Sequence, residues 1–167
     1  MKRLSILIVV FAACCSSLLA AEEKKTVVDY FLRLPDKTFE APPRAWLDNA
    51  KVIDKQNGYM SVTGDGAQPN FEVALFRYRD GRPLLALCEG ELEGENSQFL
   101  SFFEMDANGK MKSVSRSIFP FRDAGNGQGD WKFELPRQGR TVLVRSQKNE
   151  KTIRKFIWDG QRFVETK

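Results

Sequence analysis

The sequence predicts a mainly β fold, in which an antiparallel meander forms a sandwich or a partly closed barrel with a short N-terminal helix. Two observations predict this class. Turn signals recur every 15 to 25 residues between aromatic and β-branched runs, which is typical of antiparallel strands joined by hairpins. Ahead of these runs, Val27, Val28, Phe31 and Leu32 have the spacing of one helical face.

The helical part is expected at the start of the domain. The first helix covers residues 26–34 and ends before Pro35, because a proline disfavours helical backbone in the residue that precedes it. A second short helix is expected over residues 43–49, where Pro43 is suited to the first turn.

Strands are expected from there to the end of the chain. The Asn-Gly pair at 57–58 is a strong hairpin signal. Residues 71–78 alternate, which places Phe71 and Val73 on one face of a strand and Phe76 on the other. The expected strands cover residues 52–53, 59–62, 71–78, 84–88, 99–105, 111–117, 131–135, 141–145, 152–158 and 161–164.

The N-terminal residues have the organisation of a secretory signal. Residues 1–3 supply two basic side chains, residues 4–13 are apolar except for one serine, and residues 18–21 end in two alanines after which signal peptidase could cut. The apolar run is shorter than the roughly 20 residues that span a bilayer. We therefore expect residues 1–21 to be a signal peptide and residues 22–167 to form one β-rich domain in the periplasm or the secreted fraction.

The cysteines in this leader offer an alternative localisation. Residues 11–14 resemble a bacterial lipobox, although Phe11 stands where an aliphatic side chain is usual. Lipidation would anchor the domain to a membrane surface through Cys14 or Cys15. After cleavage at residue 20 or 21, Cys88 is the sole cysteine of the mature chain. No internal disulfide is then available, so the fold must rely on its apolar core.

Charge is unevenly distributed along the chain. Residues 22–109 hold 10 Lys or Arg and 16 Asp or Glu, whereas residues 110–167 hold 14 and 6. The net charge of +4 is too small to indicate a nucleic-acid partner. Either the molecule has an acidic and a basic face, or the two halves pair within a sheet and place opposite charges side by side. The interpretation in which the two halves pair within a sheet is favoured.

No residue pattern indicates catalysis, a metal or a cofactor. The chain has no histidine, which excludes Ser-His-Asp and Cys-His nucleophiles and every histidine-dependent metal site. Cys88 is followed by alternating carboxylates, which would raise its pKa and make it a poor nucleophile. We interpret the glutamates of residues 89–95 as a solvated face of a strand. We interpret residues 106–109 as a hairpin turn and residues 123–130 as a flexible loop.

The last long hairpin is the best candidate for a binding surface. If Asn149-Glu150 forms its loop, Arg145 falls opposite Arg154, Leu143 opposite Phe156 and Thr141 opposite Trp158. Arg145, Arg154, Phe156 and Trp158 would then form a basic and aromatic face for an anionic polymer or an acidic protein patch. The basic residues concentrated here are Arg137, Arg140, Arg145, Lys148, Lys151, Arg154 and Lys155.

Several segments resemble an uncharacterised group of secreted bacterial β-rich proteins. The resemblance begins with Asp29-Tyr30-Phe31, Leu34-Pro35 and Phe39, and continues through residues 57–60, 71–76, 134–139 and 158–160. These are turn and core residues, so the resemblance implies a fold and carries no active site.

Together these observations favour a non-catalytic binding or structural domain of the periplasm or the secreted fraction. Its expected partner is an envelope or extracellular protein or an anionic polymer, with membrane contact only through the signal or a lipid anchor. The alternatives are an inhibitor-like protein that binds an envelope enzyme, and a carboxylate-dependent hydrolase. A hydrolase would place two acids in a concave pocket, whereas a binder would present a basic and aromatic face.

Overall fold

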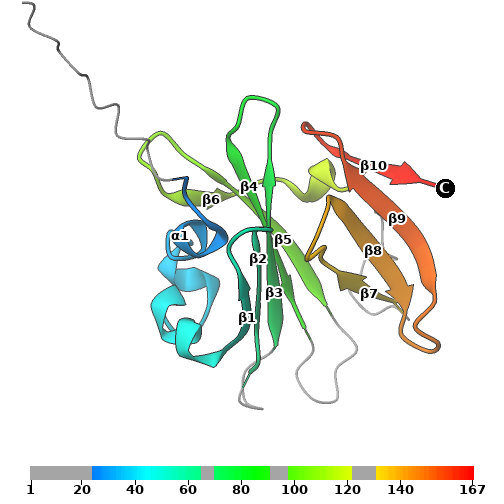
Figure 1. Ribbon diagram of the computed structural model, residues 1–167, viewed down its shortest axis with the longest axis horizontal. Helices are drawn as coiled ribbons and strands as arrows, with labels where there is room; N and C mark the ends of the chain where they lie inside the picture. The colour runs from blue at the N-terminus through cyan, green and yellow to red at the C-terminus, as the bar shows by residue number, and fades with distance from the viewer. Residues whose placement is uncertain (1–23, 65–69, 91–97, 122–130) are drawn as a thin grey trace, which may run out of the picture.

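The computed structural model describes residues 24–64, 70–90, 98–121 and 131–167. The expected signal peptide lies outside this part of the chain, as do Cys14, Cys15, Glu91, Glu93, Glu95 and the loop at 123–130. Within the described residues the chain forms two antiparallel sheets and no closed barrel (Figure 1). The predicted mainly β class with antiparallel strands is therefore confirmed.

The larger sheet has six strands, each paired with the next along the chain. Strand β4 lies inside this sheet, and its residues from Pro83 to Cys88 are all buried. The bounds are β1 (Ala50–Asp54), β2 (Tyr59–Val62), β3 (Phe71–Arg77), β4 (Pro83–Glu89), β5 (Phe99–Met105) and β6 (Met111–Ser113).

The smaller sheet has four strands in the order β10-β9-β8-β7. Its bounds are β7 (Trp131–Glu134), β8 (Thr141–Ser146), β9 (Thr152–Trp158) and β10 (Phe163–Thr166). The expectation that the acidic and basic halves of the chain pair within a sheet is wrong for most of the described strands, because β1 to β5 and β7 to β10 form different sheets. Among the described residues, only β6 of the basic half pairs with a strand of the acidic half.

The helical layer is shorter than the sequence predicts. Helix α1 (Val27–Phe31) is followed by a turn, and its first residues are capped by Thr26 and Asp29. The 3₁₀ helices are η1 (Asp36–Thr38), η2 (Pro43–Asn49) and η3 (Arg116–Ile118). The strand expected over residues 111–117 ends at Ser113, because the Ser115 hydroxyl accepts the N–H of Ser117 at 3.2 Å and starts η3.

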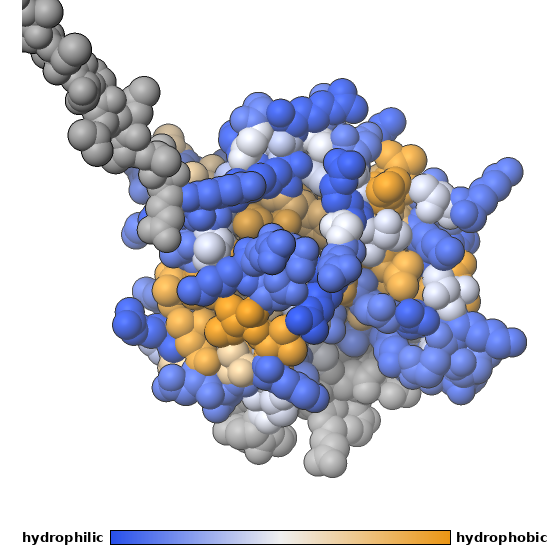
Figure 2. Space-filling model, in the orientation of Figure 1, coloured by the Kyte–Doolittle hydropathy of each residue, from blue (hydrophilic) through white to orange (hydrophobic). Residues whose placement is uncertain are grey.

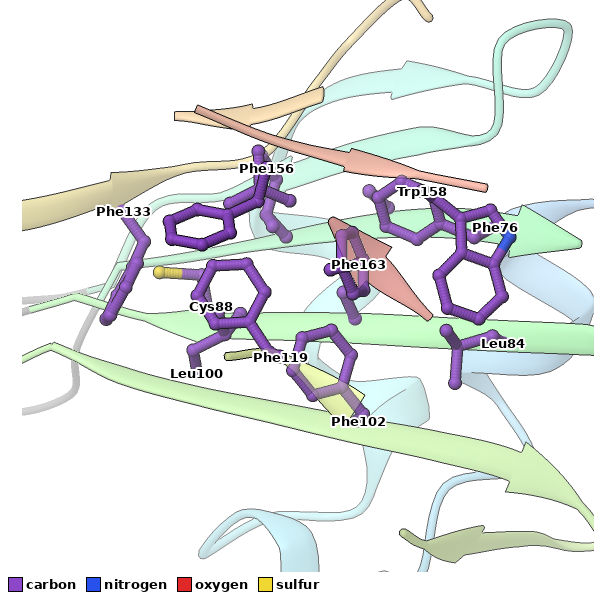
Figure 3. Packing of buried hydrophobic residues seen from close by; sticks show 14 of the residues in the cluster. Phe76, Leu84, Cys88, Leu100, Phe102, Phe119, Phe133, Phe156, Trp158 and Phe163 are labelled. Carbon is purple, nitrogen blue, oxygen red and sulfur yellow. The ribbon is translucent and has the colours of Figure 1, made fainter. Parts of the chain in front are cut away.

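The elements stack in three layers, with α1 and η2 on one side of the six-stranded sheet and the four-stranded sheet on the other (Figure 1). Strand β3 contributes to both interfaces, as its alternation predicts. Phe71 and Val73 pack under the helices, whereas Phe76 packs between the sheets against Phe163 and Trp158 (Figure 3). Each buried aromatic side chain removes roughly 150–250 Å² from water, so the described part of the chain has ample core without a disulfide.

The face shown in Figure 2 carries separate apolar patches among hydrophilic side chains. Apolar side chains gather over the helical layer, at the lower left of Figure 2, whereas hydrophilic side chains cover the centre of the face shown. Among the residues that the structure describes, no helix has both the length and the apolar character needed to cross a membrane.

Candidate functional site

The last long hairpin does not present the aromatic surface that the sequence predicts. Phe156 and Trp158 are 1% and 0% exposed and belong to the core between the two sheets. The indole N–H of Trp158 donates to the carbonyl of Arg77 at 2.7 Å, and its ring lies 5.0 Å from that of Phe163. These two predicted binding residues therefore hold the sandwich together.

The register of this hairpin also differs by one residue from the predicted one. Leu143 lies opposite Lys155 instead of Phe156. The turn is longer than the expected two residues, because Ser146 donates its N–H to the carbonyl of Lys151 at 2.8 Å and closes a four-residue loop. The shift lets both strands direct their large apolar side chains into the core.

The two predicted arginines are held by carboxylates. Arg154 pairs with Glu165 at 2.8 Å. Arg145 binds Glu134 through two guanidinium nitrogens, and this carboxylate raises the arginine pKa. The structure therefore does not bring Arg145, Arg154, Phe156 and Trp158 together as one exposed binding face.

A half-buried carboxylate links the two sheets at one end of the sandwich. The Glu72 carboxylate accepts the hydroxyl of Tyr59 at 2.9 Å and the N–H of Leu135 at 3.0 Å. A second side chain acts in the same way, since Gln98 accepts the N–H of Phe133. Glu72 and Gln98 thus accept the N–H groups of Phe133 in the edge strand β7 and of Leu135 just after it.

Two acids do line the same hollow, as a carboxylate-dependent hydrolase would require. A cavity of about 930 Å³ and its neighbour of about 460 Å³ share Glu72, Glu134 and Tyr59. Both acids already have partners there, since Glu72 bonds Tyr59 and Leu135, and Glu134 pairs with Arg145. We therefore interpret these carboxylates as structural links.

Cys88 lies beside this network and is 3% exposed. Burial raises the pKa of its thiol, and the charges of Glu72 and Glu89 raise it further. Its Sγ lies 3.8 Å from the side-chain oxygen of Gln98. Because the thiolate is the reactive form of cysteine, this environment makes Cys88 inert.

We expect Cys88 to behave as a core residue in solution. In a chain that begins at Glu22, a reducing agent should leave the Tm unchanged, and a thiol reagent should label Cys88 only after denaturation. The check is thermal unfolding with and without reductant, together with labelling rates in buffer and in denaturant. Rapid labelling of the native protein would contradict the burial of this thiol.

A different cluster of charge lies where the N-terminal segment meets the turns between strands. A hollow of about 560 Å³, which we call the basic groove, is bordered there by the β1–β2, β3–β4, β7–β8 and β9–β10 turns. Among the described residues its only acidic lining residue is Asp159. Its basic lining residues are Lys24, Lys25, Lys55, Arg77, Arg79 and Arg140.

Arg77 builds the wall that carries the N-terminal lysines. Its guanidinium donates to the carbonyls of Lys25 and Gly81, both at 3.1 Å, and lies 5.7 Å from the ring centroid of Tyr30. The bond between Arg77 and Lys25 joins residues that are 52 positions apart in the chain. The N-terminal segment is thereby fixed against the end of β3, and one side of the basic groove depends on this arginine.

Arg79 is placed by the β9–β10 turn. Its backbone N–H donates to the carbonyl of Gly160 at 3.1 Å, and its Nε donates to the carbonyl of Asp159 at 3.4 Å. Gly160 has φ +94, and a Cβ there would lie 2.8 Å from the Arg79 side chain. Glycine is therefore required at this turn, both for its backbone and for the close approach of the arginine.

The single carboxylate among the described lining residues of the basic groove offsets only one of its six positive charges. Asp159 accepts the backbone N–H groups of Gln161 and Arg162 at 2.7 and 2.9 Å, and these bonds lower its pKa. Four basic side chains of the groove make no ion pair or hydrogen bond with any described residue: Lys24, Lys25, Lys55 and Arg140. The charge of Asp29 attracts Lys55 from beyond ion-pair distance. The described lining residues of the groove therefore carry a net positive charge.

Sequence reasoning missed this cluster. Of its six basic residues only Arg140 belongs to the basic stretch that the sequence singles out, and the others come from the N-terminal segment, the β1–β2 turn and the end of β3. Their proximity is a product of the fold, so no local pattern marks it.

The comparisons with known proteins identify no relative. No family model, no curated protein and no solved structure matches the chain. The resemblance to secreted bacterial β-rich proteins thus stays an expectation based on the quoted segments, and any function must be argued from the basic groove itself.

Proposed function

We propose that this chain is an exported, non-catalytic binding domain of the periplasm or the secreted fraction, and that its basic groove binds an anionic partner. One observation carries the proposal. Six basic side chains from four separate segments border a single hollow that contains one carboxylate among its described lining residues.

The electrostatics of the basic groove support this assignment. Like charges that gather on a surface repel one another, so a cluster without counter-charges weakens the fold unless a ligand neutralises it. Some basic groups elsewhere pair with acids, as in Arg82 with Asp80 at 2.8 Å and Arg137 with Asp54 at 3.1 Å, and other described basic groups are single charges on the surface. The groove differs because four cations that lack an ion pair with any described residue border one hollow.

The localisation in this proposal rests on the signal-like residues 1–21. Cleavage would release the domain from Glu22 onward, two residues before the groove begins at Lys24. A lipid anchor at Cys14 or Cys15 would instead hold the same domain at a membrane surface. Either route leaves the groove intact.

The proposal is tested by reversing charge inside and outside the basic groove. We expect the Lys55→Glu/Arg140→Glu variant to bind heparin, a sulfated polysaccharide, at least about thirtyfold more weakly than the unaltered chain from Glu22 onward. A contact between two unit charges at 4 Å in water contributes about 1 kcal/mol, and reversal replaces attraction with equal repulsion. Isothermal titration calorimetry at low salt measures the change.

The matched control is Lys110→Glu/Lys155→Glu, which makes the same change in net charge away from the groove. This control should keep most of the affinity, because long-range attraction is screened over about 10 Å at 0.1 M salt. Equal losses in both variants would show that heparin responds to net charge alone, and the basic groove would no longer be the site.

A further inference from the structure

The construction of the basic groove also indicates what kind of anion it takes. We infer that its ligand is a flexible chain that carries negative charges in series, such as a phosphate- or sulfate-bearing polymer, and not a single small anion or a folded acidic protein. This inference rests on the proposed function and specifies its partner.

The first argument is that backbone amides at the edge of the groove are already in use. The N–H groups of Asn57 and Gly58 both donate to Asp54, at 3.1 and 2.9 Å. The N–H of Arg79 donates to Gly160. In many sites for one phosphate, several converging backbone N–H groups donate hydrogen bonds to its oxygens. The amides of Asn57, Gly58 and Arg79 already donate elsewhere, so they are not available to a phosphate.

The second argument comes from the number and separation of the free cations. Lys24, Lys25, Lys55 and Arg140 extend from three different segments around the hollow. An exposed contact at 4 Å changes affinity by about fivefold, so a single anion that meets one of them would be held weakly. Four contacts made by one chain multiply to roughly 600-fold, because each later contact is intramolecular.

The third argument is shape. The hollow of about 560 Å³ lies within the range of ligand pockets, about 300–1,000 Å³. A stable protein–protein interface instead buries about 1,200–2,000 Å², mostly on flat or gently curved surfaces. A slender chain can enter the basic groove and reach cations on several sides, whereas the bulk of a folded acidic protein cannot.

The experiment measures affinity as a function of ligand length. The chain from Glu22 onward is titrated with inorganic phosphate, tripolyphosphate and long-chain polyphosphate at several salt concentrations. Dextran sulfate and polyglutamate distinguish sulfate and carboxylate chains from phosphate chains. A small folded protein with a comparable number of surface carboxylates provides the compact acidic partner. Lys55→Glu/Arg140→Glu and Lys110→Glu/Lys155→Glu are measured in parallel.

We expect affinity for long-chain polyphosphate to exceed that for inorganic phosphate by at least about a hundredfold. The logarithm of the binding constant should fall with the logarithm of salt with a slope of about −3, as expected for four contacts to a polyanion. The groove variant should lose most of this dependence on length, and the surface control should retain it.

Two results would overturn the inference and leave the proposed function standing. They are groove-dependent binding of inorganic phosphate as tight as that of polyphosphate, and groove-dependent binding of the folded acidic protein that is tighter than that of any chain. If charge reversal in the groove changes no binding at all, both the inference and the proposed function fail.

Discussion

Replacing Trp158 with alanine is expected to lower the free energy of unfolding by about 3–5 kcal/mol. The side chain is fully buried and packs against the rings of Phe76, Tyr78 and Phe163. Its removal opens a cavity between the sheets, and the carbonyl of Arg77 loses the indole N–H that it accepts at 2.7 Å. The loss combines the transfer of a large apolar group with the cost of the empty space.

Chemical denaturation followed by circular dichroism measures this change. The matched control is Ile157→Ala in the same strand, since Ile157 is 38% exposed on the outer face of the four-stranded sheet. The control should cost less than about 1 kcal/mol. If Trp158→Ala lowered the free energy of unfolding no more than Ile157→Ala does, the burial of Trp158 in the core would be contradicted. The surface role that the sequence predicted for Trp158 would then fit better.

Replacing Glu72 with alanine is expected to lower the free energy of unfolding by about 3 kcal/mol. Hydrogen bonds to a charged group contribute about 1.5–3 kcal/mol each, and a buried donor left without a partner adds its own cost. Both the Tyr59 hydroxyl and the Leu135 N–H would lose their acceptor. Glu72→Gln is the control, because its amide oxygen still accepts the Leu135 N–H. Its free energy of unfolding should fall by less than half of the loss measured for Glu72→Ala.

Titration of Tyr59 gives this prediction an independent readout. Burial, followed by the charge of Glu72, raises the pKa of Tyr59 above the ordinary value of 10.0. The folded protein therefore holds the phenolic proton more tightly than the unfolded chain. This contribution to stability is complete below pH 10 and is lost as the pH rises above it. Ultraviolet titration should show a lower Tyr59 pKa in Glu72→Ala than in the unaltered protein. An unchanged pKa would contradict the contact.

The fold class could be predicted because the signals for it are local. Hairpins are specified by a few turn residues, and the alternation in β3 assigns Phe71 and Phe76 to opposite faces without any knowledge of distant partners. The register of the last hairpin was predicted wrongly, because it depends on the length of the loop and on irregularities in the strands. The bond between Ser146 and Lys151 closes a loop two residues longer than expected, and the irregularity between Val144 and Arg145 leaves a net shift of one residue.

The candidate site could not be predicted in this way. The sequence draws attention to basic residues that lie close together along the chain, such as Arg145 and Arg154. The neighbouring strands of the sheet, however, also supply the acids that neutralise them. The basic groove gathers residues separated by most of the domain, from Lys24 to Arg140. Only the stacking of the two sheets and the anchoring of the N-terminal segment by Arg77 bring them together.

The capping of β7 by side chains has a consequence for how this molecule can associate with itself. The edge of a sheet is normally a template on which another chain can add a strand, and that is how many β proteins aggregate. Here the Phe133 N–H donates to Gln98, the residue before β5, and the Leu135 N–H donates to Glu72 in β3 of the facing sheet. An incoming strand at β7 would have to break these bonds, so growth into fibrils from this side of the sandwich is opposed by the same carboxylate that holds its layers together.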